Sequence, residues 1–363
     1  MRACGLAVFR RPGPGKRRPA PATSGGSALA STFGEGTFRY TVYGLRVSSD
    51  LPLPPLTALA ADADREPSDC VFRAMPANLG QPTPDGRLVA GLPCHGACHA
   101  GRLAARVHRG AGGTWFWHDG IGTAHVHPDA RRVDVYPMPD LDARMPALVL
   151  LGPVAALVLH QLGYPSLHAS AVQIEGRVVV FLGPPGQGKS TMAALLLRRG
   201  ATLITDDMLP LLARGEVVYA VPSVPTMKLA PDAVATALNL ADSLPPVSAN
   251  HHKRLLRLDA RYPFASTPTR IDAVYVLERY DPLASGRTNV TVRPLTGCES
   301  LGALLTRTFN RALLEPSENA VLLPLYARLL AQARTAVLSY PHGFEHQESV
   351  YRSILAELEK ALT

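Results

Sequence analysis

A short glycine-rich segment carries residue types at a spacing that suits the binding of a phosphate chain. Gly183, Gly188, Lys189 and Ser190 fill the pattern G-x-x-x-x-G-K-[ST] without a mismatch. In such a loop the glycines let backbone N–H groups approach phosphate oxygens closely. The lysine reaches the β- and γ-phosphates of a nucleotide, and the hydroxyl of the next residue ligates Mg²⁺. The pattern therefore predicts a site for ATP and Mg²⁺.

The residues on either side of this loop have the character that such a site needs. Arg177–Leu182 is an apolar run rich in β-branched residues, which predicts a buried parallel strand. A helix is expected over 189–199, stopped by Gly200. The N-terminus of such a helix attracts an anion. The alternative is an ordinary glycine-rich turn. The expected phosphate-binding residues are Gly183, Gly186, Gly188, Lys189, Ser190 and Thr191.

Two adjacent carboxylates follow the next expected strand, 201–205. Asp206 and Asp207 would lie at its carboxyl end, where α/β folds place their ligands. One of them can hold Mg²⁺, directly or through water, and the other is then free to accept a hydroxyl proton as general base. Neighbouring side chains of an extended strand point to opposite faces, so both can serve only if the chain bends here. The alternative is that one of them caps the next segment.

The spacing between a histidine, the loop and the two aspartates favours a catalytic role for that histidine. His168 stands in Leu167-His-Ala-Ser-Ala171, and a lone histidine is more often structural than catalytic. Together with the loop, Arg199-Gly200 and Thr205-Asp-Asp207, this segment resembles the catalytic core of HPr serine kinase/phosphorylase. The resemblance implies a P-loop α/β kinase fold. It also implies catalytic roles for His168, Lys189, Asp206 and Asp207. Asp207 would be the proton acceptor for a serine, which leaves Asp206 to hold Mg²⁺ together with Ser190.

The rest of the chain departs from the bifunctional members of that family, because their N-terminal domain and downstream signature are not found. Tyr40–Pro52, Leu150–Gly152 and Val221–Asp232 instead resemble the HPr-kinase-like proteins of peptide natural-product clusters. Those linked to lasso peptides phosphorylate the C-terminal serine of a precursor peptide, so the resemblance implies such a peptide as partner. Basic residues are expected to hold the transferred phosphate or a peptide carboxylate, although solvated surface charge explains them equally well. These residues are Lys228, Lys253 and Arg254.

Two other functions stay open at this point. One is an HPr-type serine kinase that acts on a folded carrier protein in carbon regulation. The other is a module that senses ATP without transferring phosphate, against which the spacing of His168 and Asp207 speaks. The sequence decides neither between ATP and GTP nor on the oligomeric state, and a homo-oligomer remains open.

Charge and composition narrow the classes of partner. The chain has 363 residues and 47% hydrophobic content, which predicts a globular protein long enough for two domains. Residues 1–34 carry Arg2, Arg10, Arg11, Lys16, Arg17 and Arg18 and no acid, so most of the net charge of +8 lies there. We therefore expect no nucleic-acid partner. Residues 1–36 are predicted to be a disordered basic tail, or sequence that precedes the true start of translation.

An uncharged stretch, Met145–Leu162, is long enough to span a membrane. Its prolines, Pro146 and Pro153, argue against that, so we expect a buried helix, no membrane partner and a cytoplasmic protein. Cys94, His95, Cys98 and His99 are four potential zinc ligands, but no second pair follows at the usual spacing.

The remaining pattern divides the chain into four parts. They are a tail over 1–36, a mostly-β N-terminal domain over 37–140, a linking helix over 141–166 and a P-loop kinase domain over 167–363. Strands are expected in the N-terminal domain at 40–43, 46–47, 70–73, 103–108, 114–117 and 132–136. In the kinase domain, strands are also expected at 216–221, 271–277 and 289–293. From Cys298 onward the chain is expected to be helical, ending in a helix over 345–362.

Overall fold

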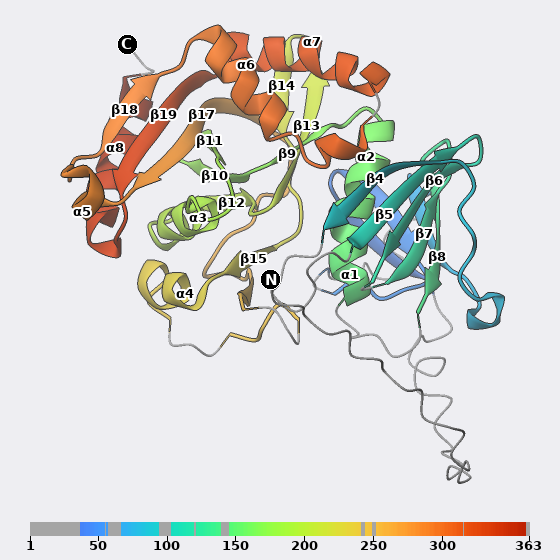
Figure 1. Ribbon diagram of the computed structural model, residues 1–363. Coiled ribbons are helices and arrows are strands. Elements are labelled where there is room, and N and C mark those ends of the chain that lie inside the picture. The colour runs from blue at the N-terminus through green and yellow to red at the C-terminus, as the bar shows by residue number, and fades with distance from the viewer. Residues whose placement is uncertain are drawn as a thin grey trace, which may run out of the picture.

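Two regions of different architecture make up the computed structural model of the chain (Figure 1). The structure describes residues 37–54, 56, 67–93, 103–119, 121–138, 145–240, 244–248, 252–314 and 316–360. The first region is a β-rich N-terminal sheet, and from residue 166 onward strands and helices alternate. The fold is therefore mixed α/β. The predicted tail over 1–36 and the Cys94–His99 cluster lie outside the described residues.

The N-terminal sheet has eight strands in the described part of the chain, in the order β1-β2-β3-β8-β7-β6-β5-β4. Neighbours are antiparallel except β2–β3 and β3–β8. The strands are β1 Phe38–Val42, β2 Leu45–Ser49, β3 Cys70–Ala74, β4 Arg87–Pro93, β5 Leu103–Gly110, β6 Gly113–His118, β7 Gly122–Val126 and β8 Arg132–Pro137. Sequence patterning did not predict β4 and β7. Gly91, Pro93 and Gly122 break their apolar runs, and pairing with neighbouring strands outweighs weak propensity.

The uncharged stretch after this sheet is helical but not one straight helix. It consists of α1 Met145–Val149, a π-helical turn Leu150–Val154 and α2 Ala155–Gln161. Pro153 has no N–H to donate, and Gly152 leaves the helical region with φ −108° and ψ −107°. The expected single helix is therefore broken at this pair.

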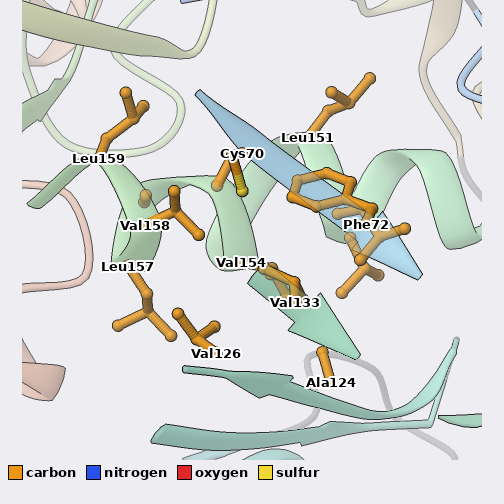
Figure 2. Packing of buried hydrophobic residues seen from close by; sticks show 14 of the residues in the cluster. Cys70, Phe72, Ala124, Val126, Val133, Leu151, Val154, Leu157, Val158 and Leu159 are labelled. Carbon is orange, nitrogen blue, oxygen red and sulfur yellow. The ribbon is translucent and has the colours of Figure 1, made fainter. Parts of the chain in front are cut away.

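Buried side chains of the broken helix complete the core of the N-terminal region. Leu151, Val154, Leu157, Val158 and Leu159 pack over the inner face of the sheet, as Figure 2 shows. The sheet contributes Cys70, Phe72, Ala124, Val126 and Val133 to this cluster. Among the described residues, no helix has the length and apolar character needed to cross a bilayer.

The second region is built on a nine-stranded sheet, counted over the described residues. Its path is β12-β10-β11-β17-β14-β13-β9, and β19 joins β17 and pairs β18. The strands are β9 Ser166–His168, β10 Ser170–Ile174, β11 Arg177–Leu182, β12 Thr202–Thr205, β13 Met208–Arg214, β14 Val217–Ala220, β17 Thr269–Tyr280, β18 Thr291–Pro294 and β19 Arg334–Pro341. A separate two-stranded antiparallel sheet pairs β15 Thr226–Leu229 with β16 Arg254–Arg257. β11, β17 and β19 run parallel, as predicted for 177–182.

Helices cover both faces of this sheet (Figure 1). α3 Lys189–Arg198, α4 Pro231–Ala237 and α8 Gln347–Glu359 share one core with it. α6 Gly297–Thr306 and α7 Pro316–Gln332 share the other. The side chains of β11 alternate between the two cores: Val179 and Phe181 enter the first, Val178 and Val180 the second. The short helices are η1 Ala77–Leu79, α5 Pro282–Ser285, η4 Arg311–Leu313 and η5 Phe344–His346.

The expectation of a helical C-terminal part is wrong at Arg334–Pro341, which forms strand β19. This segment is rich in residues that suit strands, and it pairs along its whole length with β17. The helix expected over 345–362 is α8, and the one expected over 189–199 is α3, which ends before Gly200 at φ 90°.

The two regions contact each other through specific polar pairs. Arg109 of β5 lies 2.7 Å from Glu318 of α7, and Asn310 donates a 3.0 Å hydrogen bond to the Pro153 carbonyl. Met208 of β13 belongs to the core of the N-terminal sheet. The N-terminal sheet is therefore packed directly against the strands that carry the predicted site.

Candidate functional site

The glycine-rich loop joins the end of β11 to the start of α3, as its pattern predicts. Gly188 has φ 86°, and a Cβ there would lie 2.6 Å from the Tyr340 hydroxyl, so only glycine fits. That hydroxyl donates a 2.6 Å hydrogen bond to the carbonyl of Gln187, whose side-chain oxygen accepts from the N–H of Arg279. β17 and β19, the strands that carry Arg279 and Tyr340, thus hold the loop in place.

The Lys189 ammonium lies over this loop and donates to the carbonyls of Gly183 at 2.8 Å and Pro184 at 3.3 Å. Lys189 is buried, which lowers its pKa, and the nearby charge of Arg307 lowers it further. The carboxylates of Asp207 and Asp206 act in the opposite direction. A lysine in this position is a buried cation between the loop and two acids.

The chain bends at Asp206 and Asp207, between β12 and β13. β12 and β11 are both antiparallel to β10, so they point the same way and their carboxyl ends share one edge of the sheet. The bend is held by Thr205, whose hydroxyl donates to the Met208 carbonyl at 2.8 Å. This is the bend that the sequence required if both carboxylates were to reach the loop.

Asp206 is buried, and its carboxylate accepts hydrogen bonds from neighbouring strands and from the loop helix. Its Oδ2 accepts from the Lys228 N–H at 2.8 Å, and its Oδ1 lies 3.3 Å from the Ser170 hydroxyl. The side chain of Ser190 also donates to it. Burial raises the pKa of Asp206 to about 6, although the bonds from Lys228 and Ser190 lower it. The Ser190 hydroxyl and this carboxylate together form a pair of oxygen ligands of the kind Mg²⁺ prefers.

Asp207 sits between two nitrogen groups. Its Oδ1 lies 3.2 Å from His168 Nδ1, and its Oδ2 lies 2.9 Å from the Lys228 ammonium. Burial raises the pKa of Asp207, but the charge of Lys228 and the contacts with His168 more than offset it and hold the pKa well below its usual range. The same pairing raises the pKa of Lys228. Asp207 is therefore ionised and held with its oxygens in a fixed orientation.

One open cavity of about 650 Å³ connects the loop to these acids. The predicted residues that line it are Gly186, Gly188, Lys189, Ser190, Thr191, His168, Asp206, Asp207, Lys228 and Lys253. Gly183 and Arg254 are not among the lining residues. Sequence reasoning missed Arg279, Tyr340 and His342, which also line the cavity. Arg279 lies near the carboxyl end of β17, and that end meets the loop. Its place at the end of a predicted strand is the feature of the sequence that could have marked it as a site residue.

Comparison with known proteins adds little to the geometry described above. No protein-family model and no curated protein matches the chain. Among solved structures, the chain is similar to the HPr(Ser) kinase/phosphatase from Coxiella burnetii, with 11% identity and a TM-score of 0.27. The match covers 53% of this chain and 97% of that chain. A TM-score this low assigns neither an activity nor a role to any residue.

Proposed function

We propose that the chain is an ATP- and Mg²⁺-dependent kinase that transfers the γ-phosphoryl group to a serine hydroxyl of a small peptide. The observation that carries this proposal is the position of Asp207. It lines the same cavity as the glycine-rich loop and is held there by His168 and Lys228. A module that only senses ATP has no need of a carboxylate oriented toward the end of a bound triphosphate.

The phosphate chain would be held by groups that already point into the cavity. Backbone N–H groups of Gly186 and Gly188 and the N-terminus of α3 suit the α- and β-phosphates. Lys189 then moves from the loop carbonyls to the β- and γ-phosphates. Ser190 and Asp206 would hold Mg²⁺, which neutralises charge on the bridging phosphates. The buried Asp206 fits this role because its raised pKa shows a carboxylate with too little compensating charge around it.

Asp207 would act on the acceptor. The serine Oγ attacks the γ-phosphorus, the bond from that phosphorus to the β,γ-bridging oxygen breaks, and ADP leaves with the electron pair. The hydroxyl proton passes to Asp207. A carboxylate with a lowered pKa is a weak base, so its main contribution before transfer is to orient the hydroxyl, and it takes the proton as the new P–O bond forms. His168 positions Asp207 through the contact between His168 Nδ1 and the Asp207 Oδ1 atom.

The acceptor we propose is the C-terminal serine of a lasso-type precursor peptide. The resemblance of residues 40–52 and 221–232 to the kinases of peptide natural-product clusters supports it. So does the position of Asp207 in the wall of a cavity, because a chain end can enter a cavity without unfolding anything. The competing acceptor is a folded carrier protein of the HPr type.

Mass spectrometry tests the two acceptors side by side. The protein is incubated with ATP and Mg²⁺ and either a peptide that ends in serine or a folded HPr-type carrier. We expect one phosphate on the terminal residue of the peptide, lost when that serine is replaced by alanine and lost with Asp207→Asn. Phosphate found only on the carrier would reject the peptide, and transfer to neither would reject the kinase.

A further inference from the structure

A second, smaller cavity lies on the side of Asp207 that faces the N-terminal region. Its volume is about 80 Å³, and it shares Asp206, Asp207 and Lys228 with the large cavity and no other lining residue. The broken helix contributes Ala147, Leu148, Leu151 and Gly152, and the turn after β1 contributes Tyr43. No residue of the glycine-rich loop lines it. Asp207 therefore lies between two cavities, and only the larger one borders the glycine-rich loop.

The position of this small cavity suits the geometry of phosphoryl transfer. The attacking and leaving oxygens lie roughly in line on opposite sides of the transferred phosphorus. With the phosphates on the loop, the attacking hydroxyl has to approach from the side away from it. A group that enters the small cavity meets Asp207 from that side, and about 80 Å³ has room for a small side chain rather than for an aromatic one.

The two-stranded sheet of β15 and β16 forms another wall of the small cavity and brings the positive charge of Arg257 to it. Thr226 is paired with Arg257, and Lys228 is paired with Leu255, so these four side chains share one face, which lines the small cavity. The other face, with Met227 and Leu256, is buried in the core. Diagonal partners on one face have Cβ atoms about 7–8 Å apart. Arg257 and Lys228 are diagonal partners of this kind, and both line the small cavity.

Arg257 is exposed, and within the described part of the chain its guanidinium makes neither a hydrogen bond nor an ion pair. Lys228, on the same face, is already engaged with Asp207. A free guanidinium beside an apolar cavity is complementary to a carboxylate, which it binds with two parallel hydrogen bonds.

We infer that the small cavity receives the last residue of the acceptor chain, with its hydroxyl at Asp207 and its terminal carboxylate on Arg257. This inference rests on the proposed kinase function and adds the residue that selects the acceptor. Both groups can belong to one residue because Asp207 and Arg257 line the same small cavity. A chain terminus fits better than an internal residue, because a cavity this small with apolar walls has little room for the chain to enter and leave again.

The test compares Arg257→Gln with Arg261→Gln, using three synthetic peptides. Arg261 is exposed, packs over the Tyr262 ring at 5.2 Å and lines neither cavity, so it is a matched loss of charge. The peptides end in serine with a free carboxylate, in serine with an amide, and in serine followed by an amidated aspartate. Arg257→Gln should raise KM for the free-carboxylate peptide by about 10- to 100-fold, the range for a lost hydrogen bond to a charged group.

In this scheme kcat changes much less than KM, Arg257→Lys restores part of the affinity, and Arg261→Gln behaves as wild type. The amidated peptide should be a poor substrate for wild type and insensitive to Arg257→Gln. Equal effects of Arg257→Gln on the carboxylate and amide peptides would overturn the inference. An Arg257-dependent preference for the aspartate peptide would overturn the terminal carboxylate and assign an acidic side chain instead.

Peptide binding separates this inference from the proposed function. Fluorescence anisotropy of the labelled peptides needs no turnover. If wild type transfers no phosphate but binds the free-carboxylate peptide through Arg257, the kinase proposal fails and the cavity assignment stands. If wild type transfers phosphate while its peptide binding ignores both the carboxylate and Arg257, the kinase proposal stands and the cavity assignment fails. Thermal unfolding of each variant confirms that the exposed substitutions leave the fold intact.

Discussion

Replacing Asp207 by asparagine separates chemistry from binding and from stability. Asparagine keeps the size of the side chain and one oxygen that accepts from Lys228 or His168, but it cannot take a proton. Loss of a positioned base lowers kcat by about 10²- to 10⁴-fold, which is about 2.7–5.4 kcal/mol of transition-state stabilisation. We expect an effect of this size on transfer to a serine peptide.

The accompanying loss of stability is much smaller. The side chains of Lys228 and Asp207 are 30% and 38% exposed, so solvent screens their ion pair. Its loss costs on the order of 1 kcal/mol, or about 2–4 °C in Tm. A protein with the usual stability of about 5–15 kcal/mol stays folded after that change. Unfolding therefore cannot account for a hundredfold loss of kcat.

The assay measures kcat and KM for ATP with a serine peptide, and binding of a fluorescent ATP analogue in the same variants. Asp232→Asn is the control: Asp232 lines the same cavity and is exposed, and its carboxylate accepts from the N–H of Ala233 on its own helix. We expect it to retain activity within a few-fold. If Asp207→Asn loses ATP affinity in proportion to kcat, or keeps kcat within tenfold, the assignment of Asp207 as the proton acceptor is wrong.

Three further outcomes are expected. Lys189→Ala should abolish transfer at saturating ATP and Mg²⁺, because the developing charge on the γ-phosphoryl loses its main protein cation; activity within a few-fold of wild type would remove the loop from the mechanism. Burial raises the pKa of Asp206 from 3.8 to about 6, so the folded state binds this proton more tightly than the unfolded chain. The Asp206 contribution to stability therefore falls as pH rises from 3.8 to about 6. Because Mg²⁺ needs the ionised carboxylate, the rise in Tm on adding Mg²⁺ and ATP should be larger at pH 7.5 than at pH 5. Asp206→Asn should raise the Mg²⁺ requirement and flatten that difference, and an unchanged difference would place the metal elsewhere. Phosphorolysis should be weak or absent, because the downstream signature of the bifunctional enzymes is missing; clear pyrophosphate formation from phosphorylated peptide and inorganic phosphate would favour the carrier-protein function.

Local patterns were sufficient to predict the elements that carry the loop. β11 is a run of apolar residues that suits only a strand buried on both faces, and Gly200 stops α3 where a left-handed residue is required. The bend at Asp206 and Asp207 followed from chemistry rather than propensity, because two adjacent carboxylates reach one site only if the strand breaks.

Features set by long-range pairing escaped prediction. The sequence pattern placed the residues of β19 in a helical C-terminal part. Their pairing with β17 makes them a strand instead. Its Tyr340 closes over Gly188, a contact between residues far apart in the chain that no local pattern contains. Lys253 and Arg254 are adjacent in sequence and were grouped for that reason. Lys253 lies in a bend and lines the large cavity, while Arg254 begins β16 and lines neither cavity.

The N-terminal sheet contributes to the acceptor side of the site although it offers no catalytic group. Tyr43 has φ 58°, a conformation that a bulky residue adopts only when its surroundings require it. Burial, and secondarily the charge of Asp207, raises the pKa of Tyr43, so its hydroxyl stays protonated and donates to the Leu151 carbonyl. That bond ties the turn after β1 to the broken helix beside Gly152, and both line the small cavity. The loop, the two aspartates and His168 all come from the second region. If the small cavity binds the acceptor, the N-terminal region supplies one wall of the acceptor site, while Arg257 and the chemistry of transfer belong to the second region.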